Sequence, residues 1–163
     1  MENRSTILFE EEQKFDQRWL WILLIVVSIV ILAVQFSVFF SSSVEASGFG
    51  FYFSLFNVFL VIGLFWLFAV MKLKTTIDSE KLSMKFYPFI QKEVKWEDIK
   101  KAEVIDYGFV GGWGIRLWTK YGTVYNVKGS KGLFIQKNDN KQFLIGSQRT
   151  EELEKVLSSC FKD

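Results

Sequence analysis

Two long apolar segments lie in the first half of the chain and are followed by a segment with a different pattern. Residues 19–40 and 49–71 contain no charged side chain. As helices of 22 and 23 residues they rise about 33–35 Å each, enough for one crossing of a hydrocarbon core about 30 Å thick. Only residues 41–48 separate them. The pattern predicts a transmembrane helical hairpin over residues 19–71.

From Lys72 onward, apolar and polar residues alternate, which is typical of strands. Residues 73–77 and 82–86 predict two strands joined by a tight turn, and Pro88 ends the second of them. Further strands are expected near residues 101–107, 113–119, 123–128, 132–137 and 141–146, separated by glycines and by Asn138-Asp139-Asn140. These seven strands predict an antiparallel partial barrel.

The last residues have the spacing of an amphipathic helix. Thr150 is a candidate N-cap, and apolar residues follow at helical spacing. We expect this helix to close one end of the barrel, with Leu153, Val156, Leu157 and Phe161 inside. The fold class is therefore α+β, with residues 72–163 forming one domain behind the hairpin.

The segment before the hairpin, residues 1–18, has apolar residues among acidic ones. Ile7, Leu8 and Phe9 precede the run Glu10-Glu11-Glu12, and Phe15 follows it. Such a segment either lies at a membrane interface or pairs with the edge of a sheet, and the pattern leaves both open.

The charge pattern predicts how the hairpin is oriented. Residues 41–48 contain Glu45 but no Lys or Arg, whereas residues 72–163 contain 17 basic and 12 acidic side chains. Because Lys and Arg remain on the cytoplasmic side, we expect an external loop and two cytoplasmic termini. Val44-Glu45-Ala46 resembles a signal-cleavage site, but the acidic start and the length of the first segment favour an anchor.

Gln35 and Asn57 are the amides within the two apolar segments. Counted from the predicted inner boundary they reach similar depths, so they are expected to bond across the hairpin and support its packing. Two crossings without an ionisable residue provide no path for an ion.

Few residues here suit catalysis or metal binding. The sequence has no histidine and a single cysteine, and no pair of carboxylates lies in an apolar context. We therefore expect no enzyme activity, metal or cofactor. Gly108, Gly111, Gly112 and Gly114 lack the following helix that a phosphate loop needs, so we expect positive φ angles or a bulge instead.

Arg116 is the residue most suggestive of a site, because it lies mid-strand between Ile115 and Leu117. Two interpretations remain. Arg116 is either paired with Glu103 or Asp106 in a structural role, or it binds an anionic group or a peptide carboxylate. In the second case, the surface that contacts the ligand or partner consists of Trp113, Arg116, Tyr125 and Asn126.

Lysines are concentrated directly after the second apolar segment. Lys72, Lys74, Lys81 and Lys85 are candidates for contact with anionic lipid, and the alternative is a solubilising surface that also sets orientation. A net charge of +5 over residues 72–163 is too mild to indicate a nucleic-acid partner.

The sequence resembles a known family. The resemblance is carried by residues 73–78, Phe86-Tyr87-Pro88-Phe89, Trp96-Glu97-Asp98-Ile99, residues 112–116, residues 125–129 and Ile145-Gly146-Ser147-Gln148. These are similar to small bacterial two-span membrane proteins with a C-terminal pleckstrin-homology-like domain. The resemblance implies the fold and a place in the cell inner membrane, and it implies no reaction. Lys81 replaces the glycine usual in the first turn of that domain.

These observations predict a membrane-anchored, non-catalytic module that recognises a protein segment or a lipid head group at the cytoplasmic face. The alternative is a structural or assembly subunit that acts through the hairpin. The expected partner is the lipid bilayer, and a membrane-protein partner or self-association is left open.

Overall fold

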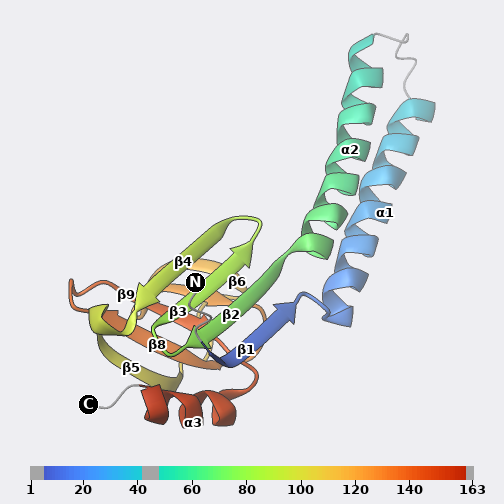
Figure 1. Ribbon diagram of the computed structural model, residues 1–163. Coiled ribbons are helices and arrows are strands. Elements are labelled where there is room, and N and C mark those ends of the chain that lie inside the picture. Colours follow the sequence, from blue (N-terminus) through green and yellow to red (C-terminus); the bar gives the residue numbers. More distant parts are fainter. Residues whose placement is uncertain (1–5, 42–47, 161–163) are drawn as a thin grey trace. The chain divides into compact units, whose positions relative to one another are not determined.

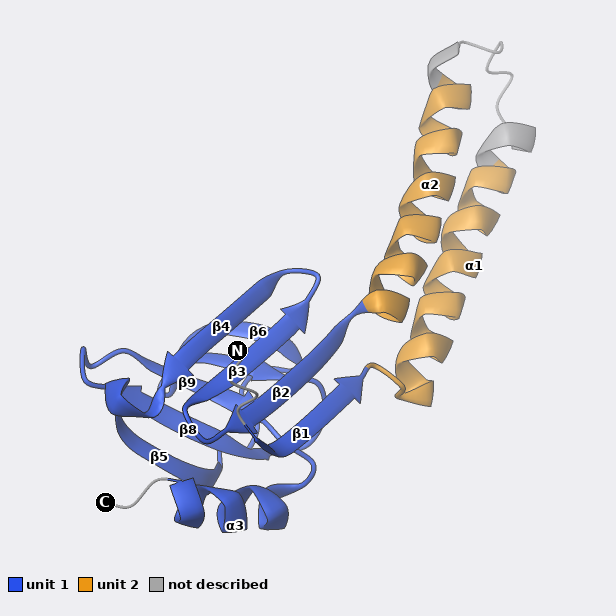
Figure 2. Ribbon diagram, viewed as in Figure 1, with its two compact units in different colours: residues 1–14, 71–163 blue, residues 15–70 orange. Residues whose placement is uncertain are grey.

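A computed structural model describes residues 6–41 and 48–160 (Figure 1). The chain forms two compact units (Figure 2). One unit combines Met1–Lys14 with Met71–Asp163, and the other is Phe15–Val70. The first unit is therefore built from two stretches of sequence that the second unit separates.

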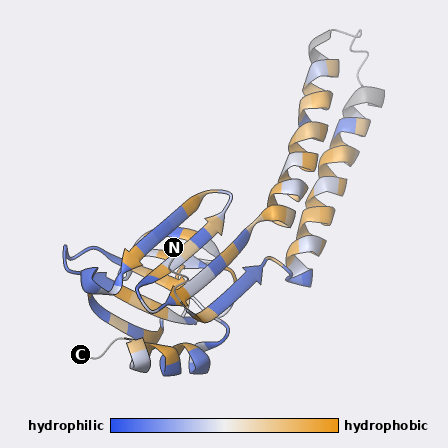
Figure 3. Cartoon of the chain, viewed as in Figure 1, coloured by the Kyte–Doolittle hydropathy of each residue, from blue (hydrophilic) through white to orange (hydrophobic). Residues whose placement is uncertain are grey.

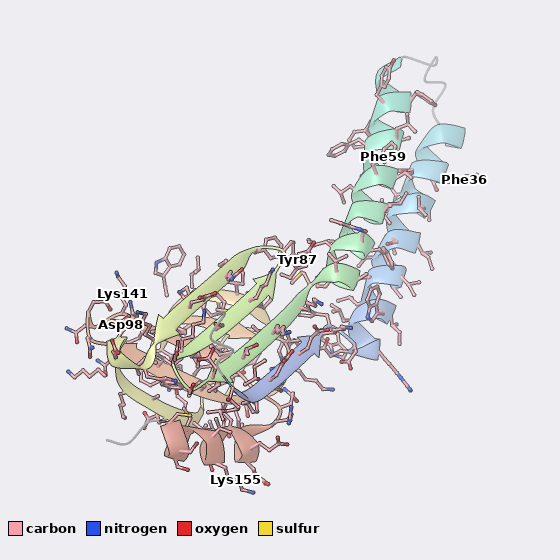
Figure 4. The ribbon with its side chains drawn as sticks, in the orientation of Figure 1. Phe36, Phe59, Tyr87, Asp98, Lys141 and Lys155 are labelled. Atoms are coloured by element: carbon pink, nitrogen blue, oxygen red, sulfur yellow. The ribbon has the colours of Figure 1, made fainter. Side chains whose placement is uncertain are left out.

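The unit of residues 15–70 is a helical hairpin. Helices α1 (Arg18–Ser41) and α2 (Gly48–Val70) agree with the predicted spans to within one residue. Both are long and apolar enough to cross a membrane (Figure 3). Phe36 and Phe59 project outward from α1 and α2 (Figure 4). The predicted loop, residues 41–48, lies almost wholly outside the described residues.

The start of α1 and the end of α2 are held together by aromatic side chains. The Trp21 indole N–H donates to the Phe15 carbonyl over 2.9 Å. The Phe15 ring meets Phe68 edge-on, with 5.8 Å between centroids. These contacts fix one end of the hairpin.

Sheet A of the other unit is antiparallel and has the order β1-β2-β3-β4. Its strands are β1 (Ile7–Lys14), β2 (Lys72–Asp78), β3 (Lys81–Tyr87) and β4 (Ile90–Lys95). In the β2–β3 turn, Asp78 Oδ1 accepts from the N–H groups of Glu80 and Lys81, each over 2.8 Å. The Asp78 side chain stabilises this turn, so Lys81 is accommodated where a glycine was expected.

Of the two interpretations of the N-terminal segment, the structure shows sheet-edge pairing. Residues of β1 pair with β2, with Lys14 opposite Lys72. The Gln13 side-chain amide also donates to the Gly146 carbonyl over 2.7 Å. The described residues up to Lys14 therefore belong to the same compact unit as the two sheets. Because β1 precedes α1 and β2 follows α2, both ends of the hairpin lie on the same side of any membrane it crosses.

Sheet B has the order β5-β8-β9-β7-β6. After the short helix η1 (Trp96–Asp98) come β5 (Ile99–Asp106), β6 (Gly114–Thr119), β7 (Gly122–Asn126), β8 (Lys131–Lys137) and β9 (Gln142–Gly146). The seven-stranded antiparallel prediction is wrong in two respects. β1 and β4 are additional strands, so the described residues form two sheets of four and five strands. β7 and β9 pair in parallel, because β8 lies between them in the sequence and runs in the opposite direction.

Buried apolar residues of both sheets and of helix α3 (Thr150–Cys160) form the core. Leu82, Met84 and Phe86 are fully buried along one face of β3. Leu153 and Leu157 of α3 are buried as predicted. Val156 is only half-buried, and Phe161 lies outside the described residues. The helix contacts β1, β5 and β8.

Candidate functional site

A glycine-rich connection between β5 and β6 forms one wall of a small pocket. Gly108, Gly111, Gly112 and Gly114 have φ angles of +63°, +85°, +121° and +105°, which confirms the expected backbone role of these glycines. The pocket has a volume of about 210 Å³. It is lined by Gly108, Phe109, Val110, Gly112, Trp113, Asn126, Gly129 and Ser130.

Asn126 is the buried polar side chain of this pocket, with 1% of its surface exposed. Its Nδ2 donates to the Tyr107 hydroxyl over 3.2 Å and approaches the Gly112 carbonyl at 3.5 Å. Its Oδ1 is buried and has no hydrogen-bond partner. An unsatisfied acceptor at this depth is costly unless another molecule donates to it.

The Tyr107 hydroxyl holds the Asn126 side chain in place through a hydrogen bond. The Tyr107 hydroxyl donates to the Gly129 carbonyl over 3.2 Å and accepts from Asn126. Burial raises the pKa of this phenol above its ordinary value near 10, the Asn126 hydrogen bond opposes that shift, and the Asp106 charge adds to it. Tyr107 is therefore held neutral, in the form that donates to Gly129.

Exposed aromatic side chains surround the entrance. Phe109 is 84% exposed, and Trp113 is also partly exposed. Further along the chain, Trp118 is 94% exposed and has a φ of +55°. The β6–β7 register shifts between Arg116 and Thr119, which ends the alternation along β6. The strand expected near residues 113–119 therefore forms as β6, but its regular alternation stops after Arg116, and Leu117 is exposed.

Arg116 does not have the ion pair that the structural interpretation required. Within the described part of the chain, Glu103 pairs with Lys101 over 2.7 Å, and Asp106 accepts from the Gly108 N–H over 3.0 Å. The Arg116 guanidinium instead lies against Gly112, where any Cβ would collide with it. Arg116 Nε is buried without a partner, and Arg116 is not among the residues lining the pocket.

Tyr125 is not a surface residue. It is 2% exposed, and the Lys92 ammonium lies 5.1 Å above its ring. Because side chains alternate along β7, Tyr125 and Asn126 face opposite sides of sheet B. Of the four predicted residues, the structure brings Trp113 and Asn126 to the pocket, places Arg116 behind Gly112, and buries Tyr125 in the core.

The sequence-based prediction missed Tyr107, Phe109 and the Gly129–Ser130 turn. The alternation of Val124, Tyr125 and Asn126 already separates Asn126 from Tyr125, and this signal was available. The positions of Phe109 and Gly129 depend on the path of a loop, for which periodicity gives no signal.

Three of the four candidate lipid-binding lysines are paired with carboxylates. Lys72 pairs with Glu12 over 3.0 Å, Lys74 with Glu10 over 2.5 Å, and Lys81 with Glu93 over 2.7 Å. Hydrogen bonds to Glu10 and Glu93 raise the pKa values of Lys74 and Lys81, respectively. Lys85 instead lies 5.9 Å from the centre of the Tyr87 ring. The acidic residues of β1 therefore offset the positive charge at the start of β2.

The expected hydrogen bond between Gln35 and Asn57 is wrong. Asn57 Nδ2 donates to the Phe53 carbonyl of its own helix over 2.9 Å. Gln35 Nε2 is buried without a partner. An amide within a helix can bond the carbonyl one turn earlier, and at Asn57 this local bond replaces the predicted bond between the helices.

No family model matches the chain, and no curated protein matches it. Residues 6–41 and 48–160 contain no group of three or more side chains suited to holding a metal ion.

Proposed function

We propose that this chain is a membrane-anchored, non-catalytic binding module that holds a protein segment in the pocket beside β6. In this proposal, α1 and α2 cross the cell inner membrane and both termini are cytoplasmic. The sheet unit is a pleckstrin-homology-like domain. The observation that carries the proposal is that Asn126, whose buried Oδ1 has no partner, lines a pocket with aromatic walls.

The chemistry of the pocket favours a protein segment over a lipid head group. None of its lining residues is charged. Asn126 Oδ1 requires a donor, whereas a phosphate presents acceptor oxygens and prefers Arg or Lys. A peptide N–H or an amide side chain supplies the donor, and Phe109, Val110 and Trp113 supply apolar contact area.

The neighbouring strand supports the same partner class. β6 lies at the edge of sheet B and pairs with β7 alone in the sheet order. An edge strand presents unpaired backbone groups to which an extended segment can bind. A segment lying along β6 would reach the pocket through Gly114, which is opposite Asn126 in the ladder.

The test is selection of peptides from a random display library on the full-length protein in lipid nanodiscs. Selected peptides should lose about tenfold in affinity, or about 1.4 kcal/mol, with Trp113→Ala and with Asn126→Leu. Phe89→Ala is the matched control, because Phe89 is an exposed aromatic residue that neither lines the pocket nor belongs to β6. Failure to select any peptide, or equal affinity for all variants, would overturn the proposal.

A second candidate function is an assembly subunit that acts through the hairpin, and Gln35 favours it. An amide without a partner inside a membrane seeks an acceptor on a neighbouring helix. Gln35→Leu should then abolish self-association, measured by cross-linking in membranes, while peptide binding by the sheet unit remains. Unchanged association with Gln35→Leu would remove this candidate.

A further inference from the structure

The two hairpin turns at opposite ends of sheet A differ in chemistry. The β2–β3 turn contains Asp78, Ser79 and Glu80, as expected for a turn facing water. The β3–β4 turn contains Tyr87, Pro88 and Phe89, with Tyr87 40% and Phe89 53% exposed. A water-facing domain gains nothing from two exposed aromatic residues in a tight turn, so this turn requires a separate explanation.

The register of sheet A shows which end carries the aromatic turn. Lys72 lies opposite both Lys14 and Tyr87. Only Met71 separates α2 from β2, and three residues separate β1 from α1. Both covalent connections to the hairpin therefore leave sheet A at the end that carries the β3–β4 turn.

This connection limits how far the turn can lie from the membrane. Opposite residues of an antiparallel pair have Cα atoms about 4.5–5.5 Å apart, and consecutive Cα atoms are about 3.8 Å apart. Tyr87 therefore lies within about 10 Å of Met71 at any angle between helix and sheet. Trp66, one turn before the end of α2, is a typical residue of the membrane–water interface.

The turn is also well positioned and bears an unpaired positive charge. The Phe89 N–H donates to the Phe86 carbonyl over 2.8 Å, and the two rings are 6.5 Å apart. Lys85 is exposed and, among the described residues, has no carboxylate partner, unlike Lys72, Lys74 and Lys81. Figure 4 shows Tyr87 at the β3–β4 end of the unit, with Asp98 and Lys141 at the opposite end.

We infer that the β3–β4 turn is a second membrane contact, in which Tyr87 and Phe89 insert into the head-group layer of the bilayer that α1 and α2 cross. Lys85 then faces the phosphates of anionic lipids. Aromatic rings favour this layer because they have an apolar body, and a lysine beside them adds attraction to anionic lipid. The inference rests on the proposed membrane crossing and is independent of the peptide-binding pocket.

Depth-dependent fluorescence quenching of the full-length protein in phosphatidylglycerol-containing vesicles tests this contact. A fluorophore is attached through Phe89→Cys, Ser79→Cys or Phe59→Cys, each in a Cys160→Ser background, and the lipids carry a quencher near the head group or in the acyl chain. We expect head-group quenching at position 89, none at position 79, and acyl-chain quenching at position 59. Equal signals at positions 79 and 89, with position 59 quenched, would overturn the inference. An unquenched position 59 would instead overturn the proposed membrane crossing and, with it, the second contact.

In a second arrangement of this experiment, the fluorophore is attached outside the β3–β4 turn. With the fluorophore attached through Gln91→Cys, the double change Tyr87→Ser and Phe89→Ser should reduce head-group quenching to about half. Phe109→Ser removes a more exposed aromatic residue elsewhere in the unit and should leave quenching unchanged. A turn covered by a protein partner would give no lipid quenching in either arrangement, which also overturns the inference.

Discussion

Glu11 and Asn126 are both buried polar side chains, and they differ in how completely their hydrogen bonds are satisfied. Glu11 is 6% exposed, and its carboxylate accepts from the Ser147 hydroxyl over 2.6 Å and from the Gln148 N–H over 2.8 Å. Asn126 uses its donor but leaves its acceptor empty. The difference indicates that Glu11 holds the fold together, and the empty acceptor is the reason we propose that Asn126 binds another molecule.

The largest expected loss of unfolding free energy follows from Glu11→Ala. Removing the carboxylate leaves the buried Ser147 hydroxyl and the part-buried Gln148 N–H without this acceptor, which should cost about 2–4 kcal/mol of unfolding free energy. Thermal or denaturant unfolding of the sheet unit in the full-length protein measures it. Glu10→Ala is the matched control on the exposed face of the same strand, and an equal loss in both variants would contradict a special role for Glu11.

A much smaller effect on stability is expected for Asn126→Leu. One of the two polar atoms of Asn126 is already unpaired, and Tyr107 keeps its bond to Gly129, so unfolding free energy should change by about 1 kcal/mol or less. The same unfolding experiment measures this change. A loss as large as that of Glu11→Ala would make Asn126 a structural residue and weaken the proposed pocket.

The stability of the sheet unit should depend on pH through Tyr107, whose hydroxyl bonds to Asn126. Its pKa is raised in the folded chain, mainly by burial, so folding favours the protonated phenol. Its contribution to stability is complete below the ordinary pKa near 10 and is lost as pH rises through the higher folded value. The stability difference between the wild type and Tyr107→Phe should therefore shrink above pH 10, as measured by unfolding at a series of pH values. A constant difference would contradict this assignment.

The smallest effect is expected at the exposed ion pairs of β1. Hydrogen bonds from Lys72 and then Lys14 lower the pKa of Glu12, so its contribution is present above its ordinary value near 4.5 and is lost as pH falls. Glu12→Gln should lower the melting temperature slightly at neutral pH and low salt, and not at high salt. A decrease that persists at high salt would show that more than this exposed pair is lost.

The sequence predicts well those parts of the fold that have a clear period. Both helices of the hairpin, most strands and the buried residues Leu153 and Leu157 follow from the spacing of apolar residues. β4 was missed because Lys92 occupies an inward position, where its ammonium lies over the Tyr125 and Phe143 rings. The pairing of β1 with β2 joins residues about 60 to 70 positions apart, and no local pattern encodes such a contact.

The candidate site was predicted only in part, because the paths of its loops leave no local pattern in the sequence. Trp113 and Asn126 were identified as chemically suitable side chains, and both line the pocket. The role of Asn126 depends on Tyr107 and Gly129, which reach it through the path of two loops. Arg116 was expected to meet a charge, and its position beside Gly112 follows from the glycine's lack of a side chain.

The place of β1 in sheet A has a consequence for how the chain is made. β1 is synthesised before both helices, but the groups that bind Glu11 follow 136 and 137 residues later. β1 therefore cannot pair with β2 until both helices have been synthesised, and Glu11 lacks its partners until nearly the whole sheet unit has been translated. A chain in which only one helix has crossed leaves β1 and β2 in different compartments, and its sheet cannot close. Closure of sheet A therefore requires both ends of the hairpin on one side of any membrane that it crosses.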